Sequence, residues 1–157
     1  MKRLAALSMI AWLAAPAMAA PSIAGVPWII DGDTLDIHGT RIRLFGIDAP
    51  EREQVCDRAG RAWRCGESAK RALIRFIGQR AVTCAPRGRD HYGRTVAVCS
   101  IGGADINRWM VAQGRAVAYR HYSDAYDGAE DQARAAHRGI WAGTFEQPWR
   151  WRRAHPH

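Results

Sequence analysis

Alternating apolar and polar positions in the first half of the chain predict short strands. Residues 26–30 form a short apolar run, and residues 34–38 alternate apolar with polar side chains, as a half-buried strand does. Turn sequences, Asp-Gly and then Gly-Thr, follow these two segments. In the next segment Ile42 and Leu44 fall on one face, and Arg43 falls on the other. We therefore expect three strands, with Arg43 outside the apolar face.

A helical period replaces the alternation further along the chain. Residues 67–77 carry apolar side chains on one helical face and are followed by Gly78. Two further helices are expected over residues 105–113 and 124–138, each followed by a glycine. Two more strands are expected near residues 81–85 and 95–100, joined by the polar sequence PRGRDHYGR. Three strands, a helix, two strands and two helices predict an α+β fold, and a five-stranded barrel with three helices fits that order.

The beginning of the chain has the pattern of a secretory signal peptide over residues 1–19. Two basic residues precede an apolar stretch, residues 4–15, and small residues lie before a cleavage site near Ala19. The stretch is shorter than the ~20 residues that span a membrane, so no stable membrane anchor is expected. We expect one domain over residues 20–145, a C-terminal tail over 146–157, and a monomer that is secreted or periplasmic.

The charge of the chain favours an anionic partner. The formal net charge is +8, of which +6 remains when the two basic residues of the signal peptide are removed. Most of the positive charge is arginine, whose planar group of N–H donors matches phosphate oxygens. A basic exported domain is compatible with nucleic acid or another anionic surface, and the charge alone does not distinguish them.

Four cysteines follow the signal peptide: Cys56, Cys65, Cys84 and Cys99. Export favours disulfides, and four cysteines allow three pairings. The short CxxC spacing of a zinc site is absent from the sequence. We favour Cys56 with Cys65 across a short loop and Cys84 with Cys99 across a hairpin, while the other two pairings remain possible.

Acidic and basic residues recur at the ends of the first strands. Asp33 lies in the turn DGDT, and Asp48 lies where an antiparallel return can bring it back beside Asp33. Two carboxylates at one turn suit a hard cation that takes oxygen ligands. Glu51 follows three residues later and is a candidate general base. Arg43 and Arg94 are candidates for stabilising charge on a phosphate, although each alone could be an ordinary surface residue.

Three motifs in this order resemble a known family. DGDT, then RLFGIDAPE, then DHYGR are similar to the signature of the staphylococcal nuclease-like (thermonuclease) family, over about residues 26–141. The resemblance implies a five-stranded oligonucleotide/oligosaccharide-binding (OB) barrel with three helices. It also implies a calcium-dependent endonuclease that hydrolyses DNA and RNA and leaves 3′-phosphate ends.

The resemblance also implies a role for single residues. Asp33 and Asp48 match the calcium-binding carboxylates, and Ala49 matches a position whose backbone carbonyl binds the ion. Glu51 matches the base that activates water.

Other matching positions would contact the substrate. Arg43 and Arg94 match the arginines that bind the scissile phosphate. Tyr92 and Tyr119 match aromatic residues near the nucleotide, and His91 replaces a lysine that often lies beside the phosphate of the nucleotide.

The tail PWRWRRAHPH allows two interpretations. Its arginines and tryptophans could bind single-stranded nucleic acid, or its tryptophans could pack onto the domain, which we favour. For the whole chain, the alternative to a nuclease is a module on the same fold that binds nucleic acid or protein without cutting. That alternative predicts loss of the acidic and arginine positions, all of which are present.

Overall fold

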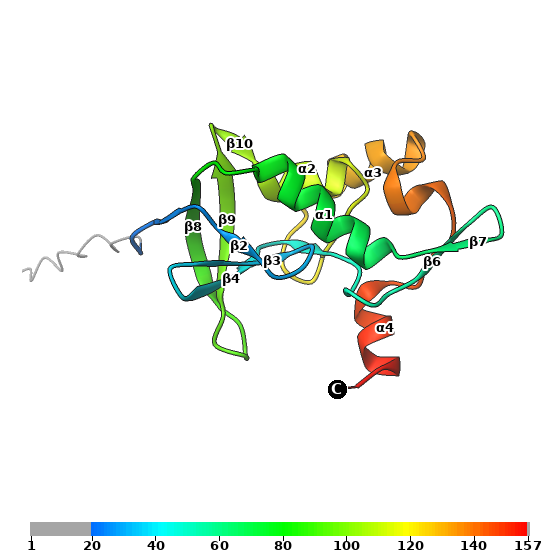
Figure 1. The fold of residues 1–157 in the computed structure, drawn as a ribbon, viewed down its shortest axis with the longest axis horizontal. Coiled ribbons are helices and arrows are strands. Elements are labelled where there is room, and N and C mark those ends of the chain that lie inside the picture. The colour runs from blue at the N-terminus through cyan, green and yellow to red at the C-terminus, as the bar shows by residue number, and fades with distance from the viewer. Residues whose placement is uncertain (1–19, 157) are drawn as a thin grey trace, which may run out of the picture.

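A computed structural model describes residues 20–156, and its centre is one twisted sheet (Figure 1). The strands of this sheet are β1 (Ile23–Gly25), β2 (Trp28–Ile29), β3 (Thr34–Ile37), β4 (Thr40–Leu44), β8 (Val82–Arg89), β9 (Thr95–Ile101) and β10 (Ala104–Asp105). The hydrogen-bonded order is β1-β8-β9-β4-β3-β2, with β10 added to β9. Every pair is antiparallel except β4 with β9, which are parallel.

Helices and two small strand pairs surround the sheet. The helices are α1 (Cys65–Ile77), α2 (Ile106–Ala112), α3 (Asp127–Ala135) and α4 (Pro148–Ala154), with a 3₁₀ turn at Gly139–Ala142. The small pairs are β5 (Ile47–Asp48) with β11 (Val117–Ala118), and β6 (Cys56–Arg58) with β7 (Arg61–Trp63). Figure 1 shows α1, α2 and α3 together along one side of the fold, whereas α4 stands apart from them at the C-terminus.

The predicted α+β class and the faces of the first strands are confirmed. Ile42 and Leu44 have no exposed surface, while Arg43 lies on the opposite face of β4. The β3–β4 hairpin pairs Thr34 with Arg43, so the turn that carries Asp33 lies beside the end of β4. This register brings the first two motifs together.

Several elements differ from the expectation. β8 runs on through Arg89, because Gly88 and Arg89 still pair with β9 after an irregularity at Pro86, so part of the expected polar loop is strand. The third expected helix, 124–138, is shorter and covers only Asp127–Ala135. The tail forms a fourth helix, α4, which was not expected.

Two disulfides support two separate apolar clusters, and both favoured pairings are confirmed. Cys84 and Cys99 lie opposite each other on β8 and β9 inside the main core. Cys56 and Cys65 join the start of β6 to the start of α1 in a second cluster. Trp149 of α4 packs against this second cluster, which is the docking of the tail that the sequence analysis favoured.

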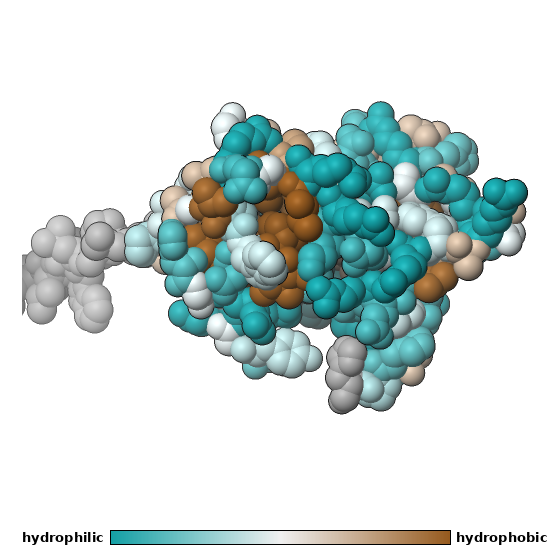
Figure 2. All heavy atoms as spheres, viewed as in Figure 1, coloured by the Kyte–Doolittle hydropathy of each residue, from teal (hydrophilic) through white to brown (hydrophobic). Residues whose placement is uncertain are grey.

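The surface combines apolar and strongly polar areas. Figure 2 shows apolar side chains gathered over the area of β2, β8 and the second half of α1. Exposed large apolar side chains in this part of the chain are Val26, Trp28 and Ile74. Within residues 20–156, no helix is long and apolar enough to cross a membrane. The expected signal peptide, residues 1–19, lies outside the described residues.

Candidate active site

The turn before β3 fixes Asp33 against the segment that follows β5. Asp33 is 4% exposed, and its Oδ2 accepts a hydrogen bond from the backbone N–H of Ala49 at 2.8 Å. Its Oδ1 accepts one from the Thr34 hydroxyl at 3.0 Å. Gly32 permits this close approach, because a Cβ there would lie 2.7 Å from the Cβ of Ala49 and 2.9 Å from that of Ala69. The small residues of the two motifs therefore let the acidic groups converge.

Arg43 joins the two predicted metal-binding carboxylates. Its Nη1 donates to Asp33 Oδ1 at 3.0 Å and its Nη2 donates to Asp48 Oδ1 at 2.8 Å. Asp48 is fully buried on β5, and the Arg43 side chain is 13% exposed. A guanidinium has five N–H donors, so Arg43 keeps donors that these carboxylates do not use.

Burial and neighbouring charges shift the pKa values of Arg43, Asp48 and Asp31. Burial would lower the pKa of Arg43, but the charges of Asp33 and Asp48 outweigh it and raise that pKa above its ordinary value. Burial raises the pKa of Asp48, although hydrogen bonds and charges from arginines oppose the shift. Burial and the charge of Asp33 raise the pKa of Asp31 to about 7. The acids at this site are therefore costly to ionise together unless cations compensate them.

A tight turn after Pro50 places Glu51 at the rim of the same site. Its backbone N–H donates to Gln54 Oε1 at 3.2 Å, and the Gln54 N–H donates back to the Glu51 carbonyl at 2.8 Å. The start of α1 packs on this turn, because a Cβ on Gly66 would lie only 1.6 Å from the Glu51 carbonyl oxygen. The Glu51 side chain is 25% exposed, so solvent can reach it.

The β8–β9 hairpin loop positions Arg94. Asp90 Oδ2 accepts a hydrogen bond from Arg94 Nε at 2.7 Å, and Asp90 Oδ1 accepts one from the Arg94 backbone N–H at 3.0 Å. Burial would raise the pKa of Asp90, but the hydrogen bonds from Arg94 lower it below its ordinary value. The Arg94 guanidinium lies 5.3 Å from the ring centre of Tyr92. Asp90 thus binds the arginine through its Nε, so the donors on the two terminal nitrogens are not used by this carboxylate.

Most of the predicted site residues line one cavity of about 230 Å³. Asp48 lies behind it, bonded to Arg43. The predicted residues that line the cavity are Asp33, Arg43, Ala49, Glu51, His91, Tyr92, Arg94 and Tyr119. The three motifs, which lie far apart in the sequence, therefore meet at one place.

Three residues of the site were missed in the sequence. Asp31 is the first acid of DGDT; its Oδ1 accepts the Asp33 N–H at 3.0 Å, and it lines the cavity. Asp90 is the first residue of the third motif, DHYGR, and holds Arg94. Arg152, from α4, donates hydrogen bonds to Asp48 at 2.8 and 2.9 Å and to Glu51 at 2.7 Å. Motif context could have indicated the two acids, but nothing in the local pattern singles out Arg152 among the tail arginines.

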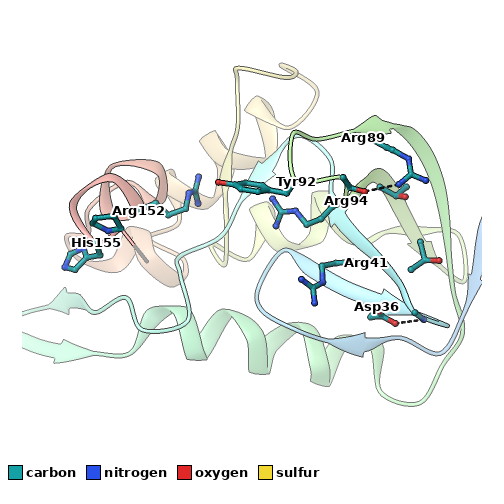
Figure 3. Close-up of a pocket in the computed structure, with 12 residues that line it drawn as sticks. Asp36, Arg41, Arg89, Tyr92, Arg94, Arg152 and His155 are labelled. Atoms are coloured by element: carbon teal, nitrogen blue, oxygen red, sulfur yellow. Dashed lines mark hydrogen bonds between the residues drawn. The ribbon is translucent and has the colours of Figure 1, made fainter.

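An open groove of about 1100 Å³ begins at the cavity and is rich in arginine. Tyr92, Arg94 and Arg152 line both spaces, so the groove and the cavity are neighbours. Figure 3 shows Arg152 and His155 on the α4 side of the groove, with Arg41, Arg89 and Arg94 on the side of the sheet. Arg94 and Arg152 are paired with carboxylates, and Arg41 and Arg89 add positive charge along the groove that suits an extended polyanion.

The donor atoms at the cavity suit a hard cation, yet they are already engaged. Asp33 and Asp48 offer carboxylate oxygens and Ala49 offers a carbonyl, which are the ligand types that calcium prefers. In residues 20–156, however, no group of three or more His, Cys, Asp or Glu side chains forms a ready metal site. Both oxygens of Asp48 accept hydrogen bonds from arginine. The residues fit calcium by chemistry, and arginine donors occupy the Asp48 oxygens in this structure.

Several known proteins are similar in sequence to this chain over most of its length. A family model described as staphylococcal nuclease homologue matches residues 41–143. A succinoglycan biosynthesis protein, ExoI, of Rhizobium meliloti is 41% identical over 132 residues, which cover 82% of this chain and 69% of that protein. A protein of Shigella flexneri named micrococcal nuclease is 35% identical, covering 80% of this chain and 78% of its own length. An uncharacterized endonuclease of Haemophilus influenzae is 37% identical, covering 80% of this chain and 70% of its own length. The chain belongs to the staphylococcal nuclease family, and its α+β fold is the OB-like fold of that family.

Proposed function

We propose that this chain is a calcium-dependent nuclease that hydrolyses DNA and RNA to products with 3′-phosphate ends. The observation that carries the proposal is the convergence of Asp33, Arg43, Glu51 and Arg94 on one cavity, with Asp48 bonded to Arg43 behind it. Relatives named as nucleases support the same reaction class. The two disulfides are consistent with a secreted or periplasmic protein.

Glu51 is proposed as the general base. Its carboxylate lines the cavity and is partly exposed, so it can accept a proton from a water molecule beside it. The mutual hydrogen bonds with Gln54 and the packing of Gly66 hold its backbone in one position. A fixed base removes part of the entropy cost of aligning water with phosphorus.

Arg43 and Arg94 are proposed to stabilise the charge that builds on the phosphate oxygens. Each guanidinium is anchored by a carboxylate, Arg43 by Asp33 and Asp48, and Arg94 by Asp90. Anchored donors need no rearrangement when the charge develops, which makes such stabilisation effective. The high pKa of arginine makes proton donation by these groups unfavourable, so we assign them an electrostatic role.

Asp33, Asp48 and the Ala49 carbonyl would hold the calcium ion. The ion would supply positive charge at a phosphate oxygen of the substrate. His91, Tyr92 and Tyr119 line the cavity and would contact the nucleotide, with stacking favoured by the exposed ring of Tyr92. The groove with Arg41 and Arg89 would carry the rest of the strand.

Cutting assays with the mature, oxidised protein test this function. Plasmid, single-stranded DNA and RNA are incubated with calcium or with a calcium chelator, and the ends are examined for a 3′-phosphate that blocks extension by a polymerase. We expect cutting only with calcium. Arg94→Ala should lower kcat by about 10²–10³. Binding without cutting by the unaltered protein would instead favour the non-catalytic module.

A further inference from the structure

Arg152 binds both carboxylates on which the proposed mechanism depends. Its Nη1 donates to Asp48 Oδ1 at 2.8 Å and to Glu51 Oε1 at 2.7 Å. Its Nη2 donates to Asp48 Oδ2 at 2.9 Å. One guanidinium therefore spans the buried carboxylate and the proposed base. Burial would lower the pKa of Arg152, but the hydrogen bonds and charges of these acids outweigh it and raise that pKa.

The packing of α4 against the rest of the protein holds Arg152 in this position. Pro148 is buried at the first turn of α4, and the Trp149 ring centre lies 5.9 Å from that of Tyr119. The segment before the helix is held by Gln54, whose Nε2 donates to the Glu146 carbonyl at 2.7 Å. The same Gln54 brackets the Glu51 backbone. The helix that carries Arg152 is thus tied to the turn that carries the base.

A calcium ion bound to Asp48 would use the same carboxylate oxygens that accept hydrogen bonds from Arg152. Calcium takes carboxylate oxygens directly, at about 2.3–2.6 Å. Asp48 Oδ2 accepts its hydrogen bond from Arg152, and Arg152 shares Oδ1 with Arg43. Because Arg43 and Arg152 both bind this buried carboxylate, a calcium ion would be a third positive group there, where charges are screened poorly.

We propose that Arg152 is an internal cation that competes with calcium for Asp48 and Glu51, so that docking of its guanidinium and binding of the metal exclude each other. This inference rests on the calcium dependence proposed above. Arg152 also lines the arginine-rich groove, where its displaced guanidinium meets the phosphates of an entering strand (Figure 3). A bound strand therefore favours release of the carboxylates, and without substrate Arg152 weakens binding of the ion.

Calcium binding without nucleic acid, measured by isothermal titration calorimetry, tests the competition apart from activity. The mature wild-type protein is compared with Arg152→Ala and with Arg153→Ala. Arg153→Ala is the matched control, because Arg153 is an exposed arginine of the same helix and its substitution removes the same charge. We expect Arg152→Ala to bind calcium about tenfold more tightly than wild type, because the ligands are no longer occupied. Arg153→Ala should stay within about twofold, because solvent screens an exposed charge.

Arg152→Lys adds a graded test. The lysine keeps the charge but loses the planar pair of donors, so its calcium affinity should fall between wild type and Arg152→Ala. Circular dichroism and thermal unfolding check that each variant is folded. Measurable calcium affinities that are equal in Arg152→Ala and wild type, or weaker in Arg152→Ala, would overturn the competition alone. No calcium binding by any of the proteins would overturn both the competition and the proposed metal dependence.

Discussion

Two arginines bind Asp48, one from the neighbouring strand and one from the C-terminal helix, and they are placed by different means. Arg43 is five residues from Asp48 and 13% exposed, whereas Arg152 is 104 residues away and 36% exposed. The register of the β3–β4 hairpin positions Arg43, because β3 and β4 pair Thr34 with Arg43. The packing of the short C-terminal helix α4 positions Arg152. Arg43 is therefore a permanent part of the site, whereas Arg152 is the arginine that we propose can leave it.

Removal of Arg43 should have the largest effect. Arg43→Ala leaves the carboxylates of Asp33 and Asp48 without the guanidinium that joins them. Breaking a buried ion pair from one side costs about 3–5 kcal/mol of unfolding free energy. Loss of phosphate stabilisation should lower kcat by about 10²–10³.

Urea unfolding and steady-state kinetics measure the two effects of Arg43→Ala. Arg43→Lys is the matched variant, since it keeps the charge without the two-pronged geometry and should recover stability more than activity. If Arg43→Ala cuts DNA as fast as wild type, the built-in role of Arg43 is wrong.

The disulfide beneath α4 should affect the second arginine more than the first. The double variant Cys56→Ser/Cys65→Ser removes a link in the cluster on which Trp149 packs. Opening a loop of this size lowers the unfolding free energy by about 2–3 kcal/mol. Weaker anchoring of α4 should also raise the calcium affinity of the folded protein, through release of Arg152.

The disulfide of the main core provides the control. Cys84→Ser/Cys99→Ser should lower the unfolding free energy by about 3 kcal/mol or more, because the linked loop is longer. Its calcium affinity should stay close to that of wild type, because these cysteines lie in the main core and not in the cluster under α4. A rise in calcium affinity in this variant but not in the first would contradict the assigned role of α4.

The groove arginines should show the smallest effects. Arg41→Ala and Arg89→Ala remove exposed charges along the proposed path of the strand. In a Glu51→Gln background, each should weaken oligonucleotide binding by about tenfold or less. Each should also reduce the salt slope of single-strand binding by about 0.7 per contact.

Fluorescence anisotropy at several salt concentrations measures these affinities. Arg71→Ala is the control, because Arg71 is an exposed arginine of α1 whose side chain is 60% exposed and does not line the groove. Equal slopes for all three arginine variants would show that the groove does not hold the strand.

The core of the site could be predicted because its determinants are local. Turn residues, alternation and proline place Asp33, Arg43, Asp48 and Glu51 within one hairpin and the turn beyond it. The DHYGR motif located Arg94 through its resemblance to the staphylococcal nuclease family, and a tight hairpin loop holds the residue in position. These features depend on a few neighbouring residues, which a sequence shows directly.

The contribution of α4 could not be predicted in the same way. A seven-residue helix has little periodicity, and the tail pattern of tryptophan and arginine fits either docking or nucleic-acid binding. Its position depends on a cluster assembled from several distant segments, including Val117 and Ile140. Similarly, β8 extends into a polar sequence because β9 supplies its hydrogen-bond partners. Long-range packing decided both cases.

The rate of DNA cutting by Glu51→Gln, with calcium present, tests the central claim most directly. Glu53→Gln is the matched control, because Glu53 is an exposed acid of the same segment and does not line the cavity. We predict that Glu51→Gln lowers kcat by at least about 10², since the amide cannot accept a proton from water. Glu53→Gln should stay within about twofold of wild type, because most exposed substitutions have little effect. Calcium-dependent cutting at the wild-type rate by Glu51→Gln would contradict the proposed mechanism.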